Sequence, residues 1–217
     1  MNAWLLTEVF STLVLEGRTM LPEKIYLIDL QPQLVRAWDE AFDAFDFVAV
    51  RQEDFFAVPA DAMVSPANSF GIMDGGLDLA IRDTLGLQVQ DAVQRAIVEH
   101  HHGELPVGAA VVVPSGDARW PFLVAAPTMR IPESVSQTVN AYLAFRAALL
   151  AVKRHNEAAG APVIRTLVCP GLGTGIGGMD ARRCATQMLL ALKHVLAPAR
   201  IPSFRDIHLT HRALRTG

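Results

Sequence analysis

The chain has 217 residues, of which 51% are hydrophobic and 19% charged, and its formal net charge is −3. Because domains hold about 100–200 residues, this length predicts one domain, and the apolar fraction excludes a chain disordered throughout. The acidic balance argues against duplex nucleic acid as an obligate partner, since such binding needs a basic surface. The two cysteines, Cys169 and Cys184, cannot form a disulfide framework and favour a reducing, cytoplasmic setting.

A single domain is expected over residues 1–217, with residues 1–20 as an N-terminal extension. Residues 3–15 are largely apolar, but Glu8 interrupts them and they are too short to span a bilayer. We interpret them as a packed helix or ordered extension, with attachment to a partner or a membrane as the alternative. No other stretch reaches membrane-spanning length, so no membrane partner is expected.

Short apolar runs alternate with segments of helical periodicity along the rest of the chain. Strands are predicted at residues 25–30, 47–50, 62–64, 109–113, 122–126, 163–169 and 207–210. Helices are predicted at residues 34–45, 77–85 and 89–101, from a cap at Ser134 or Ser136 to about 160, and at 180–194. Residues 114–117 are predicted to form a turn. The alternation predicts an α/β fold, a three-layer α/β/α sandwich with a mixed, mostly parallel sheet.

A glycine-rich loop at residues 170–179 follows a predicted strand and precedes the helix that begins at Asp180. Five of the 15 glycines lie in it: Gly171, Gly173, Gly175, Gly177 and Gly178. Glycines let backbone N–H groups approach an anion, and the following helix adds a partial positive charge. The loop is neither a Walker loop nor a dinucleotide fingerprint. The alternative is a flexible turn without a ligand.

A second loop, residues 65–78, also runs from a predicted strand into a helix and carries Asn68, Asp74 and Asp78. Neither loop contains Lys or Arg, so a diphosphate would be held by amides and helix dipoles. Asn68 suits a sugar diol, and a carboxylate nearby suits a water molecule. The structural alternatives are Asn68 in a left-handed turn position and Asp78 as a helix cap. Asp54 could accept a hydrogen bond from an exocyclic amine; the alternative is that it is a solvated surface charge.

These segments resemble macrodomains in order and spacing. The resemblance rests on residues 61–68 (DAMVSPAN), 75–81 (GGLDLAI), 106–112 (PVGAAVV) and 171–178 (GLGTGIGG), with Asp54 seven residues before Asp61. It covers residues 47–196. It implies the macrodomain sandwich and ADP-ribose, or an ADP-ribosylated protein or small molecule, as the partner.

The resemblance also implies a role for each matching residue. Asp54 would bind the adenine amine beside Phe55, Asn68 the distal ribose, and Asp78 the attacking water. The ribose and diphosphate would lie along glycine-loop positions, namely Gly75, Gly76, Gly171, Gly173, Thr174, Gly175, Ile176 and Gly177. No cofactor and no metal are implied, and residues 100–102 (HHH) are interpreted as a helix end because adjacent histidines point in different directions.

Three departures from the family pattern bear on activity. Ser65 replaces an Asn, Asp74 interrupts a glycine run, and Gly177 replaces an aromatic that covers the ribose. An aromatic restored at residue 177 is expected to tighten binding or speed turnover, provided that the loop's φ tolerates a side chain. The tandem glutamates of poly-ADP-ribose glycohydrolases are absent. The first hypothesis is a mono-ADP-ribosyl hydrolase; the alternatives are a non-catalytic ADP-ribose reader and a ligand-free structural or assembly protein.

Overall fold

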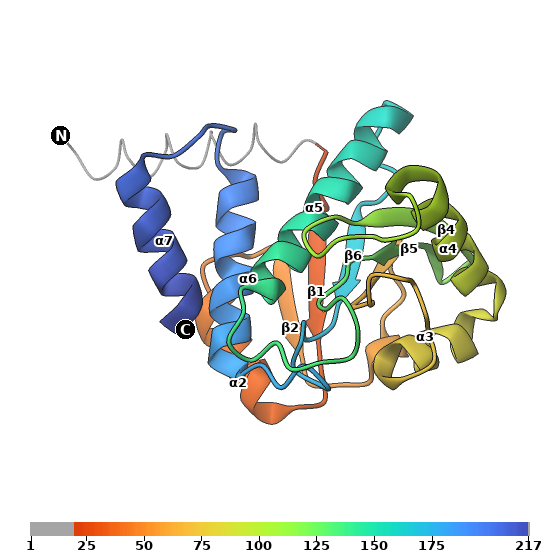
Figure 1. Ribbon diagram of the computed structural model, residues 1–217, viewed down its shortest axis with the longest axis horizontal. Helices are drawn as coiled ribbons and strands as arrows, with labels where there is room; N and C mark the ends of the chain where they lie inside the picture. Colours follow the sequence, from red (N-terminus) through yellow and green to blue (C-terminus); the bar gives the residue numbers. More distant parts are fainter. Residues whose placement is uncertain (1–19, 217) are drawn as a thin grey trace.

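The computed structural model describes residues 20–216, and they form a six-stranded sheet between two layers of helices (Figure 1). The strand order is β2-β1-β6-β3-β5-β4; β4 is antiparallel to β5 and all other neighbours are parallel. The interpretation of residues 3–15 lies outside the described residues. The strands are β1 Lys24–Ile28, β2 Val48–Arg51, β3 Ala62–Ser65, β4 Val111–Asp117, β5 Trp120–Ala125 and β6 Thr166–Cys169.

The two faces of the sheet are buried under different helices. The helices are α2 Pro32–Phe42, the 3-10 helix η1 Phe55–Ala57, α3 Gly76–Leu85, α4 Gln88–His101, α5 Asn140–Ala159, α6 Ala181–Leu196 and α7 Phe204–Thr216. Ile25 and Leu27 of β1 pack in one core with α2, α5 and α6, whereas Ile28 packs in the other with α3 and α4. This period of two, with both faces apolar, confirms the predicted α/β/α sandwich.

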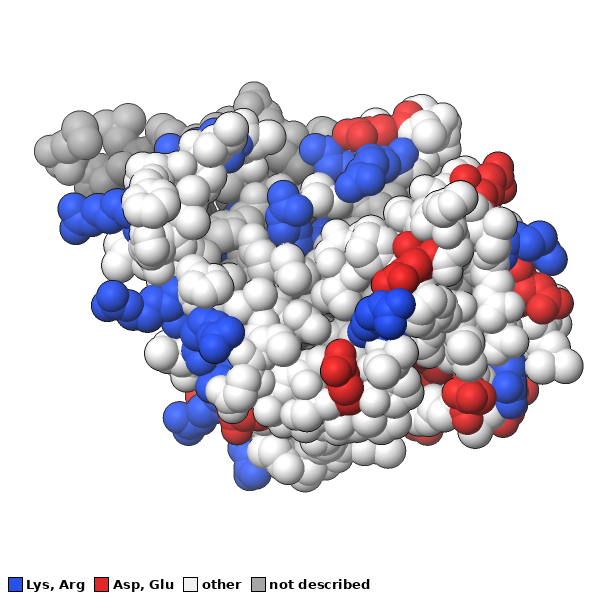
Figure 2. Space-filling model, in the orientation of Figure 1, with Lys and Arg blue, Asp and Glu red and all other residues white. Residues whose placement is uncertain are grey.

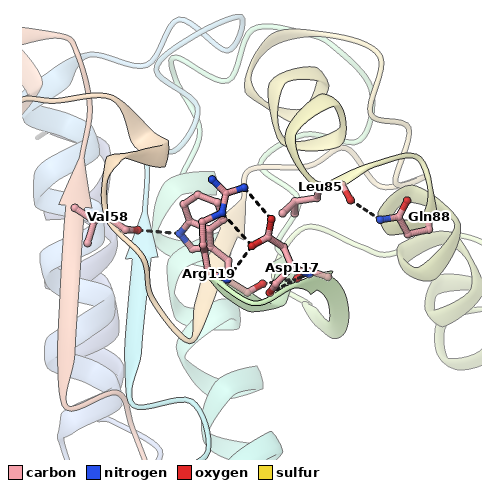
Figure 3. A network of polar contacts seen from close by, with 7 residues as sticks. Val58, Leu85, Gln88, Asp117 and Arg119 are labelled. Atoms are coloured by element: carbon pink, nitrogen blue, oxygen red, sulfur yellow. Dashed lines mark hydrogen bonds and ion pairs between the residues drawn. The ribbon is translucent and has the colours of Figure 1, made fainter.

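The hairpin between β4 and β5 differs from the prediction. Residues 114–117 are not a turn but the end of β4, and the chain reverses at residues 118–119. A register shift between Pro114 and Asp117 marks a bulge, which Gly116 permits with a φ of +84°. Asp117 then pairs with Arg119 across the turn, with oxygen–nitrogen distances of 2.8 and 3.1 Å (Figure 3).

Two other predicted elements, one strand and one helix start, also need correction. Residues 207–210 are not a strand but part of α7, whose first turn is held by Ser203, since its Oγ accepts from the Asp206 N–H at 3.2 Å. The long helix α5 begins at Asn140 rather than after Ser134 or Ser136. The cap predicted for α6 is confirmed, because Asp180 accepts from the N–H groups of residues 182 and 183 at 2.9 and 3.1 Å.

The parallel strands place chemically useful loops on one side. β1, β2, β3, β5 and β6 point in the same direction, so the segments after their carboxyl ends leave from the same edge of the sheet. In open α/β sheets this edge is where ligands bind.

We predict that Asn156→Ala lowers the free energy of unfolding by about 3 kcal/mol, since buried polar groups lose their partners. Asn156 is fully buried; its Nδ2 donates to the carbonyls of Met20 and Ile164 at 3.0 Å, and its Oδ1 accepts from Ile164 N–H at 2.8 Å. Urea unfolding measures the loss. Glu157→Ala, at the next and exposed position, is the control and should cost less than about 1 kcal/mol; equal losses would contradict this account.

Candidate functional site

A cavity of about 400 Å³ opens at the carboxyl edge of the sheet. It is lined by the segments that follow β1, β2, β3, β5 and β6. All residues predicted from the sequence lie around it, namely Asp54, Phe55, Asn68, Gly75, Gly76, Asp78, Gly171, Gly173, Thr174, Gly175, Ile176 and Gly177. The fold therefore brings the predicted set together, while the role of each residue toward a ligand stays a prediction.

The glycine loop after β6 presents backbone to the cavity. Gly173 has a φ of +74°, and a Cβ built on Gly175 would meet no atom within 4 Å, so Gly175 faces open space. Asp29, at the end of β1, anchors the loop because its Oδ2 accepts from Gly171 N–H at 3.2 Å and its Oδ1 from Gln31 N–H at 2.9 Å. The loop is thus held at its start and accessible in its middle.

Gly177 has no room for the aromatic side chain that the family pattern places there. A Cβ on Gly177 would lie 2.5 Å from Val135 Cγ2 and 2.6 Å from the carbonyl oxygen of Gly173. Val135 is itself buried, and its N–H donates to the Gly177 carbonyl at 2.8 Å. The expected gain from restoring an aromatic is therefore wrong, because the loop would have to rearrange to admit one.

Asn68 is committed to its own loop. Its Nδ2 donates to the Ile72 carbonyl at 2.6 Å, and its Oδ1 accepts from the N–H groups of Phe70 and Ile72 at 3.0 and 3.2 Å. The left-handed conformation that the alternative gave to Asn68 belongs instead to Gly71, with a φ of +61°. Asn68 therefore fixes the shape of the segment that forms this wall of the cavity.

Asp78 is a buried carboxylate in the first turn of α3. It does not cap the helix, whose N-cap is Gly75 without a side-chain hydrogen bond. Its Oδ1 accepts from the Ser65 hydroxyl at 2.6 Å, and both residues are buried. The pKa of Asp78 is raised from 3.8 to about 6, mainly by burial; the bond from Ser65 opposes the rise and the charge of Asp74 adds to it. Such a carboxyl can hold or release a proton near neutral pH.

Asp54 and Phe55 form the wall that follows β2. Asp54 is exposed, and its Oδ1 accepts from Phe56 N–H at 2.8 Å, which caps η1. Phe55 is buried in the core beneath. The second carboxylate oxygen of Asp54 has no hydrogen bond within residues 20–216, so an amine can reach it.

Sequence reasoning missed the contributions of two strands to the lining. Asp29, Leu30 and Gln31 follow β1, and Thr128 and Met129 follow β5. Their signal was their position at the carboxyl end of a strand. The described lining contains five carboxylates and no Lys, Arg or His; the acids are Asp29, Glu53, Asp54, Asp74 and Asp78. An anion here would depend on backbone amides for its attraction.

Two further searches covered residues 20–216. No group of three or more His, Cys, Asp or Glu side chains in this part of the chain is arranged to hold a metal ion. None of its helices is both long and apolar enough to cross a membrane.

The comparisons identify the class of protein. The family model described as Macro domain matches residues 64–188, more than half of the chain, and the chain belongs to this family. A protein of Aquifex aeolicus (strain VF5) is 34% identical over 133 residues, 61% of this chain and 72% of the relative. A Pantoea vagans (strain C9-1) protein named O-acetyl-ADP-ribose deacetylase 1 is 28% identical over 155 residues, 70% of this chain and 85% of the relative.

Solved structures agree on the fold. The Oceanobacillus iheyensis macrodomain with ADP matches with a TM-score of 0.54 and 19% identity, covering 75% of this chain and 86% of that one. The macrodomain of Mycobacterium tuberculosis DarG matches with a TM-score of 0.52 and 20% identity, covering 70% and 95%. The recognition of the family from four short motifs is thereby confirmed.

We predict that Asp78→Asn stabilises the protein at pH 8 by about 2–3 kcal/mol and has little effect near pH 4. Between pH 3.8 and about 6 the folded protein keeps a proton on Asp78 that the unfolded chain releases. The carboxyl therefore costs stability as pH rises through this window, and the amide removes that cost. Urea unfolding of both proteins at the two pH values measures it, and a difference that does not change with pH would contradict the prediction.

Proposed function

We propose that this macrodomain binds ADP-ribose in the cavity at the carboxyl edge of the sheet. The cavity, about 400 Å³, is within the range of small-molecule sites. Asp54 at one end would accept from the adenine amine, and the amides of residues 173–176 would hold the diphosphate. The distal ribose would then lie between Gly75, Gly76 and the loop that Asn68 shapes. A solved relative, from Oceanobacillus iheyensis, was determined with ADP.

The protein then acts as a hydrolase that removes mono-ADP-ribose from a protein or small molecule. One observation carries this step: Asp78 is a buried carboxylate among the residues that line the cavity, and its pKa is raised to about 6. An ionised Asp78 would accept a proton from water as the water attacks the anomeric carbon of the distal ribose. The bond to the carrier breaks and the carrier leaves with its electron pair and a proton. The name of the Pantoea vagans relative, a deacetylase, fits water activation at such a site.

A non-catalytic reader is the second candidate. The amide of Asn68 is used within its own loop, and Gly177 offers no aromatic cover to exclude bulk water from the ribose. A purely structural role is disfavoured because the cavity is open and its central loop unobstructed at Gly175. The free, buried cysteines Cys169 and Cys184 favour a cytoplasmic setting for either activity.

We predict that ADP-ribose binds with micromolar affinity or better and that Gly175→Glu weakens it at least about 100-fold. A Cβ at this position meets no atom within 4 Å, and the Glu side chain would bring a negative charge and bulk to the diphosphate. Asp54→Ala should cost about 10–100-fold, the value of a hydrogen bond to a charged group. Calorimetry measures both. Ala158→Glu, which adds the same charge at an exposed position of α5, is the matched control and should bind normally.

We predict that Asp78→Asn slows single-turnover release of ADP-ribose about 100-fold with a smaller change in affinity, because the Asp78 carboxylate acts on the attacking water rather than on the bound ligand. The wild-type rate should rise with pH through about 6 as Asp78 ionises. Asn68→Ala should weaken both binding and rate, because its loop loses three hydrogen bonds. Equal rates in all three proteins would remove these residues from the mechanism. A wild type that binds ADP-ribose and releases none would establish the reader.

A further inference from the structure

Three exposed isoleucines belong to loops that line the cavity. Ile72, Ile131 and Ile176 are 44%, 49% and 65% exposed, and they come from three different loops. Ile72 and Ile176 line the cavity directly. Ile131 lies between Met129 and Pro132, which both line it. We call these three side chains the apolar rim.

The loops that carry the apolar rim are tied together by their backbones. Ser69 N–H donates to the Arg130 carbonyl at 3.1 Å, and Asn68 forms an isolated bridge with Met129. On the other side, Val135 N–H donates to the Gly177 carbonyl at 2.8 Å. These backbone bonds therefore connect the three loops that carry the isoleucines. Exposed apolar side chains that gather around a site mark an interaction surface.

The charges around the apolar rim do not suit a nucleic acid. The cavity lining holds five carboxylates and no Lys, Arg or His among the residues described. Arg130, beside the rim, is already occupied, because its guanidinium donates to both carboxylate oxygens of Glu104 at 2.7 and 3.0 Å and stacks on Phe70. On the face shown in Figure 2, Lys and Arg side chains gather mainly on the side of α7. A phosphate backbone would be repelled by these carboxylates, and the nearby Arg130 is already paired with Glu104.

We propose that the apolar rim docks the carrier of the ADP-ribose, and that this carrier is a protein whose modified residue is flanked by apolar side chains. The proposal rests on the proposed function, which places the distal ribose at the Asn68 end. A carrier joined to that ribose would leave the cavity past the loops that carry Ile72, Ile131 and Ile176. Because the apolar rim is small, it contributes selectivity among carriers rather than the main affinity.

The test compares probes that share ADP-ribose and differ in carrier. They are free ADP-ribose, a peptide joined to ADP-ribose through a non-hydrolysable linker and flanked by Leu and Val, the same peptide flanked by Ser and Gly, and an ADP-ribosylated single-stranded oligonucleotide. Calorimetry or fluorescence anisotropy gives each dissociation constant. The apolar-flanked peptide should bind about tenfold more tightly than the polar-flanked peptide, and the oligonucleotide should bind more weakly than free ADP-ribose.

Variants then locate the selectivity on the apolar rim. Ile131→Ser and Ile72→Ser should each reduce the preference for the apolar-flanked peptide severalfold. Ile131→Ser, at a position outside the cavity lining, should also leave the affinity for free ADP-ribose within about twofold. Val98→Ser is the matched control, since Val98 on α4 is 67% exposed and outside the cavity lining.

Failure of this proposal is distinguishable from failure of the proposed function. Normal binding of free ADP-ribose with equal affinity for both peptides, tighter binding of the oligonucleotide, or unchanged selectivity in both Ile variants would overturn the protein-carrier assignment alone. Absence of free ADP-ribose binding in a folded sample would overturn both.

Discussion

The parallel arrangement of β1, β6 and β3 is the constraint on which the site depends. These strands lie side by side in the middle of the sheet, and helices cover both of its faces. Polar side chains and loop backbone can therefore reach solvent only beyond the ends of the strands. Residues far apart in the chain, such as Asp29 and Gly171, meet there because β1 and β6 are direct neighbours. The pairing of buried parallel strands thus brings together the loops that line the cavity.

The same burial sets the electrostatics of the cavity. Asp78 is desolvated where α3 packs against the sheet, and this burial raises its pKa. The hydroxyl of Ser65, at the end of β3, donates one hydrogen bond that replaces part of the lost hydration. With no basic side chain in the described lining, an anion here would depend on backbone amides of the loops for its attraction. Backbone donors sit at fixed positions, so they can orient a diphosphate without moving.

Much of this could be predicted from the sequence because local signals agreed with tertiary structure. The apolar run of β3 and the Asp180 cap each have a local physical meaning, and both were confirmed. The glycines at residues 171–178 form the expected loop between β6 and α6, and their role toward a ligand stays a prediction. Prediction failed where local signals were ambiguous. Residues 114–117 contain turn residues that a bulge can also use, and residues 207–210 are apolar enough for a strand although α7 packs them outside the sheet.

The site shows a second limit of sequence reasoning, which concerns partners distant in the chain. From the sequence alone, Gly177 indicates only that a side chain has been lost. In the structure, Val135 from the loop after β5 fills the adjoining space, and its N–H donates to the Gly177 carbonyl. Gly177 and Val135 therefore pack as a pair, and a larger side chain at residue 177 requires Val135 to move or to be replaced. The segment at residues 128–135 also carries Met129 and Pro132 into the cavity lining. Differences in the ligand preferred at this end should therefore follow changes in that segment rather than in the glycine loop.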